Sequence, residues 1–165
     1  MLRPACAALI CLATVSGLPA CGDDTTAAEC GPSTVEQVDP RLYHLLPDTP
    51  APSYLTDPPT SGPHISGLRM TGVQTRTLTG IEQVSTLELN IVIVQYGSRV
   101  PAEDRSRLEA LAGDDITVAP SGRDDDKVIA TGWMTKMTCV GASPDAITEF
   151  VSDYRKTSAA PGPGN

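Results

Sequence analysis

Two histidines, His44 and His64, are the residues of this chain best suited to bind a metal ion or carry a proton near neutral pH. His64 closes the stretch PPTSGPH, in which Pro58-Pro59 extends the chain and Ser61-Gly62-Pro63 makes a tight bend. Such a loop holds the imidazole in one place. That position suits either a ligand site or hydrogen bonds to the surrounding backbone, and the residue types leave both open.

Sulfur donors lie later in the chain, where Met134, Met137 and Cys139 resemble a set of copper(I) ligands. On a strand, positions 134 and 137 point to opposite faces, so we expect these methionines to serve the core or an edge. The acidic run 124–126 lacks the alternating ligands and the downstream glutamate of a calcium loop. We expect a solvated turn there.

Motifs for catalysis are absent from the sequence. It contains no glycine-rich phosphate loop, no HExxH, no G-x-S-x-G and no CxxC pair. A set of nucleophile, base and orienting group cannot be assembled from the remaining residues. We expect no cofactor apart from a metal ion, copper or zinc, at the histidines.

The composition excludes other classes of partner. The formal net charge is −8 and the sequence pI is about 4.6, which disfavours electrostatic binding to nucleic acid or anionic lipid. Hydrophobic residues make up 40% of the chain, enough for one small core. Which protein or small ligand it binds does not follow from these numbers.

The first twenty residues have the pattern of a bacterial signal peptide. Arg3 supplies the positive end, and the apolar run 5–15 is too short to span a bilayer as a permanent helix. Leu18-Pro19-Ala20-Cys21 then resembles a lipobox, which predicts cleavage after Ala20 and a lipid on Cys21. The alternative is ordinary secretion with the same cleavage. We therefore expect an extracytoplasmic protein whose partner is the membrane, through the lipid on Cys21 at the bacterial cell envelope.

The five cysteines fit this interpretation. Cys6 and Cys11 leave with the signal peptide, Cys21 takes the lipid, and Cys30 and Cys139 remain. Two remaining thiols in an oxidising compartment most simply form one disulfide, although two free thiols are the alternative. Removing residues 1–20 takes away Arg3 and no acid, so the net charge falls from −8 to −9.

The mature chain divides into an arm and a domain. Residues 21–63 form a lipid-anchored, proline-rich tether and arm, because eight of the fifteen prolines fall between positions 32 and 63. Residues 64–157 form a single α+β domain, and residues 158–165 a disordered tail. The expected elements are strands at 73–78, 87–96, 116–119 and 127–134, and helices at 101–113 and 143–156.

This order of elements predicts a two-layer sandwich: a small mixed sheet with two helices, preceded by the extended arm. A right-handed crossover makes the strands at 87–96 and 116–119 parallel. The turn at 120–126 is expected to make the strands on either side of it an antiparallel pair.

The stretch PPTSGPH, preceded by Cys30-Gly-Pro and Tyr43-His44-Leu45, resembles the bacterial exported proteins of domain of unknown function family 3105. The resemblance runs from Cys30 to Tyr154. Members of that family carry a second motif, H-S-L-E-H-G, where this chain has Ser85-Thr-Leu-Glu-Leu-Asn90. When the family's motif residues are matched to this sequence one by one, the resemblance leaves three candidate metal ligands or proton carriers: His44, His64 and Glu88.

Two functional interpretations follow. The first is an exported lipoprotein that acts as a non-catalytic binding or interaction module at the cell envelope. The second is an envelope lipoprotein that binds copper or zinc through His44 and His64. Because Ser85 and Leu89 replace the two histidines of the second motif, we expect His64 to be satisfied by the protein itself.

Overall fold

A computed structural model describes residues 28–158. The expected signal peptide, Cys21 and the expected tail beyond Ser158 therefore lie outside the described residues. The elements are β1 (Glu29–Cys30), β2 (Thr34–Val35), β3 (Gly72–Val73), α1 (Gly80–Glu88), β4 (Val92–Tyr96), α2 (Ala102–Glu109), β5 (Ile116–Pro120), β6 (Lys127–Gly132), β7 (Thr135–Val140) and α3 (Pro144–Ser158). Within residues 28–158, no helix is long and apolar enough to cross a membrane.

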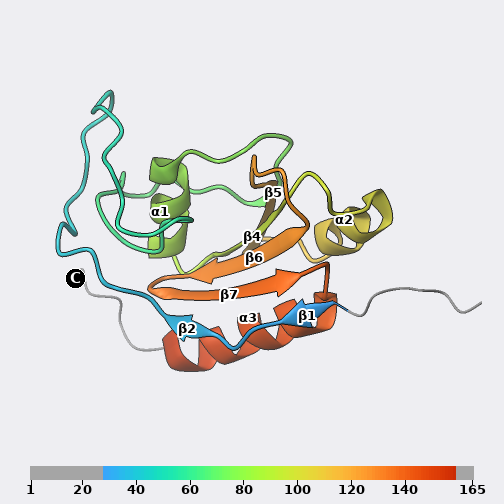
Figure 1. The fold of residues 1–165 in the computed structure, drawn as a ribbon. Helices are drawn as coiled ribbons and strands as arrows, with labels where there is room; N and C mark the ends of the chain where they lie inside the picture. The colour runs from blue at the N-terminus through green and yellow to red at the C-terminus, as the bar shows by residue number, and fades with distance from the viewer. Residues whose placement is uncertain (1–27, 159–165) are drawn as a thin grey trace, which may run out of the picture.

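One mixed sheet joins all the strands in the order β1-β7-β6-β4-β5-β3, and β2 also pairs with β7 (Figure 1). The α+β class and the mixed sheet are confirmed. Strands β4 and β5 are parallel, as the helical crossover predicts. The expected pairing across the turn at 120–126 is wrong: β6 passes β5 and pairs antiparallel with β4. Strands β3 and β4 occupy the two edges of β5, so β6 pairs with the remaining edge of β4.

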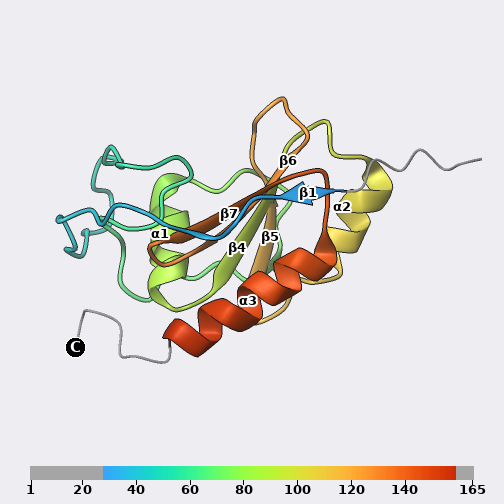
Figure 2. The ribbon, with the colours of Figure 1, turned by 60° about the horizontal axis from the view of Figure 1, so that its bottom comes forward.

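The sheet is covered on both faces rather than on one. Side chains alternate along β4, so Val92, Val94 and Tyr96 enter the core cluster that contains residues of α2 and α3. Ile93 points the other way, into a smaller cluster with Leu87 of α1. Figure 1 shows α1 and α3 on opposite sides of β6 and β7, and Figure 2 shows α3 crossing one face.

Helix α1 is an element that the sequence interpretation missed: no element was expected at 80–86, and residues 87–96 were expected to form one long strand. Thr79 caps the helix and Glu82 completes a capping box. This pair is a sufficient sequence signal for the start of a helix. The β-branched residues within the helix weaken its helical pattern. The chain breaks at Asn90, whose φ is +59°, and β4 begins only at Val92.

The stretch expected as one strand, 127–134, is the first half of a hairpin. Strand β6 ends at Gly132, Met134 turns the chain with φ at +56°, and β7 returns antiparallel. Met137 then points into the core, and Cys139 forms a disulfide, so neither serves as a copper ligand. The expected helix at 143–156 is confirmed as α3, and the helix expected at 101–113 ends four residues early.

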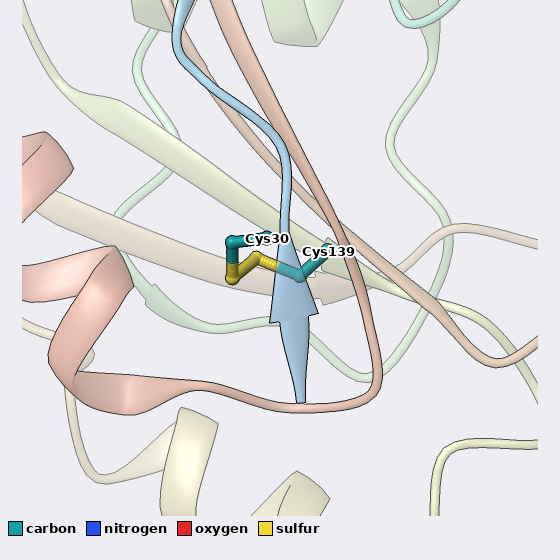
Figure 3. The surroundings of a disulfide bond; sticks show 2 residues. All are labelled: Cys30 and Cys139. Carbon is teal, nitrogen blue, oxygen red and sulfur yellow. A yellow bond between two sulfur atoms is a disulfide. The ribbon is translucent and has the colours of Figure 1, made fainter. Parts of the chain in front are cut away.

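The N-terminal arm is part of the sheet. Strands β1 and β2 both pair with β7, and a disulfide joins Cys30 to Cys139 across the β1–β7 pair (Figure 3). Lys136 of β7 also forms an ion pair with Glu36, 2.9 Å between Nζ and Oε2, and this contact lowers the pKa of that carboxyl. The arm is thus fixed to the strand that lies over α3.

Candidate functional site

The PPTSGPH loop is buried along its whole length, from Pro58 to His64. Hydrogen bonds to residues outside the loop hold it in place. The backbone N–H of Asp39 donates to the Ser61 hydroxyl, the Tyr54 hydroxyl donates to the Pro63 carbonyl, and the N–H of Met134 donates to the Thr60 carbonyl. The loop therefore has a fixed shape because the arm and the β6–β7 turn both hold it.

Glycine is required at position 62. Its φ is +130°, and a Cβ there would come within 3.0 Å of the Tyr54 ring and 3.1 Å of the Asp39 carboxylate. Asp39 itself is fully buried and receives two hydrogen bonds from the Arg41 guanidinium. Those bonds lower the pKa of Asp39, and burial together with this carboxylate raises the pKa of Tyr54 to about 12. Both groups keep their charge states at neutral pH.

His64 has one nitrogen satisfied and one free. Its Nδ1 lies 2.8 Å from the Gly62 carbonyl oxygen. A carbonyl only accepts hydrogen bonds, so Nδ1 carries the hydrogen and Nε2 of the neutral ring carries a lone pair. Nε2 is buried and has no hydrogen-bond partner among the described residues. The sequence predicts that the protein itself supplies hydrogen-bond partners to this imidazole. Within residues 28–158 only Nδ1 has such a partner.

Glu88 faces this free nitrogen. It is the last residue of α1, and its Oε1 lies 3.9 Å from Nε2 of His64, too far for a hydrogen bond. Its Oε2 is buried without a partner in the described part of the chain. The structure therefore places the imidazole of His64 beside the carboxylate of Glu88, with 3.9 Å between Nε2 and Oε1, and buries Nε2 and the second oxygen, Oε2, without a hydrogen-bond partner among residues 28–158.

His44 completes the group from the arm. Leu45 donates a backbone hydrogen bond to the His64 carbonyl and His64 donates one to the Tyr43 carbonyl, at 2.7 and 3.3 Å, so the two histidines lie side by side. Their ring centroids are 4.9 Å apart and nearly perpendicular. His44 is exposed, whereas the side chain of Glu88 is 30% exposed. The site is closed at His64 and open to solvent at His44.

These three side chains fit a small transition-metal ion. One ligand atom from each of His44, His64 and Glu88 lies within 4.8 Å of the others. Tetrahedral zinc with bonds of about 2.1 Å needs ligand atoms roughly 3.4 Å apart, so the separations between these ligand atoms must shrink by up to about 1.4 Å. The exposed His44 and partly exposed Glu88 can rotate to do so. The bond from Nδ1 to Gly62 orients His64 in the way that ligating histidines usually are.

Ser85 and Leu89, which stand where the second motif of the family has histidine, have other roles in this structure. The Ser85 hydroxyl is buried and accepts a hydrogen bond from the N–H of Ile65, directly after His64. Leu89 is the C-terminal cap of α1 and is partly exposed. Neither offers a nitrogen or carboxylate to the group.

Trp133 is the site residue that sequence reasoning missed. Its ring lies edge-on to that of His64, with centroids 5.9 Å apart. It packs against both core clusters, and its Nε1 hydrogen has no acceptor among residues 28–158. The one signal for it in the sequence is that the chain contains a single tryptophan. Its place beside His64 depends on the β6–β7 turn and so does not follow from the sequence.

Comparison with known proteins gives one match. The family model described as "Protein of unknown function (DUF3105)" matches residues 48–165. The matched stretch contains His64, Glu88 and Trp133, whereas Cys30 and His44 precede it. No curated protein and no solved structure matches the chain.

Proposed function

This chain belongs to the DUF3105 family of proteins of unknown function, and we propose that it binds one zinc or copper ion. The ligands in this proposal are His44, His64 and Glu88. Imidazole and carboxylate donors suit both metals. This proposal gives the expected binding module at the cell envelope a specific ligand.

One observation carries the proposal: the two unpartnered acceptors, Nε2 of His64 and Oε2 of Glu88. Buried polar atoms without partners cost about 1–3 kcal/mol each, so natural proteins rarely leave two together. Neither atom can donate to the other while the ring is neutral and the carboxyl ionised. A cation between them satisfies both lone pairs at once.

Three protein ligands leave a fourth coordination position for water or for a group from outside. The exposed side of the site, at His44, is where such a group can approach. An ion held in this way is suited to transfer to or from a partner, because its ligand His44 lies on the surface. The other two ligands, the buried His64 and the half-buried Glu88, hold the ion in place. We infer a role in holding or passing on a metal ion.

The location forms a second part of the proposal. We infer that the protein is exported and held at the envelope by lipid on Cys21, which the motif Leu18-Pro19-Ala20-Cys21 supports. Metabolic labelling with a radioactive fatty acid tests this in cells. Label should enter the wild type and be lost in Cys21→Ser, and a Cys21→Ser protein that still fractionates with membrane contradicts the anchor.

Metal binding is tested by titrating Zn²⁺ and Cu²⁺ into tag-free mature protein in a calorimeter, since a histidine tag would bind both ions. We expect one equivalent to bind and the thermal midpoint to rise, because a ligand that binds only the folded state stabilises it. Glu88→Gln should weaken binding by at least about tenfold. Glu103→Gln on α2, an exposed carboxylate far along the chain, is the matched control.

His64→Ala should abolish binding, but it also removes a buried ring. Its circular dichroism spectrum and melting curve must therefore show a folded protein before the titration is interpreted. Glu88→Gln keeps the test valid if His64→Ala does not fold. Absence of any stoichiometric metal in the wild type, or equal binding by wild type and Glu88→Gln, overturns the proposal.

A further inference from the structure

A groove separate from the metal-ligand group runs between α3 and the arm. Its volume is about 850 Å³, within the range of sites for drug-sized molecules. One wall is the arm from Cys30 to Val35, the other is α3, and the β6–β7 turn closes one end. In Figure 1, β1 and β2 lie along α3 on this side of the molecule.

The surfaces of the groove are apolar and aromatic. Trp133, Met134, Met137, Phe150 and Tyr154 all line it, and the rings of the last two are stacked with centroids 6.4 Å apart. Val35, on the arm side, is 88% exposed, so the groove offers apolar surface directly to solvent. Exposed apolar surface of this kind marks a binding site more often than chance.

The charged side chains of the groove all have one sign. Glu149 and Asp153 line it from successive turns of α3, and no lysine, arginine or histidine is among the lining residues. Asp153 forms an ion pair with Lys156, but Glu149 has no ion pair among the described residues. The chain as a whole is also acidic, which raises the local concentration of cations.

We propose that this groove binds an amphiphilic cation, a molecule with an alkyl or aryl body and an amine or quaternary ammonium head. The body lies on the methionines and aromatic rings, and the head lies near Glu149. Aromatic faces together with a carboxylate are the combination that recognises such heads, through cation–π attraction and charge. Neither an anionic lipid nor a nucleotide has charge complementary to these walls.

The test uses two probes with the same chain length and opposite heads, decyltrimethylammonium and decanoate, below their micelle concentrations. Excess EDTA keeps metal out of the His44–His64–Glu88 group. Trp133, the only tryptophan, lines the groove, so its fluorescence reports binding directly. We expect saturable binding of the cation, with decanoate at least about tenfold weaker.

Two variants locate the binding. Ala146→Leu fills the groove from α3 and should weaken the binding of decyltrimethylammonium at least about tenfold. Glu149→Gln should weaken the binding of this cation about threefold or more and should not weaken that of decanoate, because it removes a negative charge that repels the anion. Glu103→Gln on α2 is the control for Glu149→Gln. Equal binding of both probes, no saturable binding of the cation, or unchanged binding in a folded Ala146→Leu protein overturns the proposal.

Discussion

His44 and His64 lie side by side because their backbones run parallel and exchange two hydrogen bonds, from Leu45 to His64 and from His64 to Tyr43. The arm residue is thereby placed against the buried loop residue. Since one imidazole is exposed and the other is buried, the two should respond differently to substitution.

His44→Ala should reduce metal affinity by at least about tenfold, since one of three ligands is lost. The stability of the metal-free protein should change by no more than about 0.5 kcal/mol, because the side chain is exposed. Calorimetric titration and urea unfolding of the same preparation measure the two quantities. A large loss of metal-free stability with unchanged metal binding would show that His44 only supports the fold.

Copper and zinc should affect Trp133 fluorescence differently. The indole ring lies 5.9 Å from the His64 ring, so an ion bound to His64 is close to the fluorophore. Cu²⁺ has an open shell and quenches at this range, whereas Zn²⁺ has a filled shell and no redox chemistry. We expect stoichiometric quenching by Cu²⁺ alone, and quenching in Glu88→Gln only at Cu²⁺ concentrations at least about tenfold higher. Quenching that does not saturate at one equivalent contradicts a site at His64.

The disulfide should be the largest single contribution to stability. Cys30 and Cys139 close a loop with a sequence separation of 109, and the chain-entropy model gives about 4–5 kcal/mol for a loop of that size. The Cys30→Ala/Cys139→Ala double variant should therefore unfold at markedly lower urea concentration, with the arm released first. Wild type unfolded with and without reductant provides the comparison. A loss below about 1 kcal/mol would mean that the pairing of β1 and β2 with β7 holds the arm without the bridge.

Acid should destabilise the protein partly through Glu82. Hydrogen bonds from Arg76, assisted by the N–H of Thr79, lower the pKa of Glu82 from 4.5 to about 2 in the folded state. A group whose pKa is lower when folded contributes stability above its unfolded pKa, and that contribution is lost as the pH falls from about 4.5 to about 2.

Glu82→Gln should accordingly cost about 1–2 kcal/mol at pH 7, where it removes the ionised partner of the capping box and of Arg76. The difference from wild type should shrink toward pH 2. Urea unfolding of both proteins at pH 7, 4 and 2 measures it. A difference that is the same at all three values would show that the lost hydrogen bonds, and not the charge, account for the effect.

Local signals in the sequence were sufficient for several features. Ser143-Pro144-Asp145 predicts the start of α3, and a run of β-branched residues that is apolar on both faces predicts β4. The two cysteines that remain after the expected cleavage at Ala20 predict the disulfide. These features depend on a few neighbouring residues, or on a count of thiols, so they can be deduced without knowing the packing.

The tertiary structure decided the remainder. Helix α1 forms where no helix was expected, because the Ser85 and Thr86 hydroxyls gain partners in residues 65–70 when the helix packs there. The donor set of His44, His64 and Glu88 could be named from the sequence, but its proximity depends on a backbone bridge between distant segments and on the end of that helix. Likewise, the single tryptophan lies between His64 and the groove only because the chain turns at Met134. Such long-range placements depend on the free energy of the whole packed arrangement, which no short stretch of sequence contains.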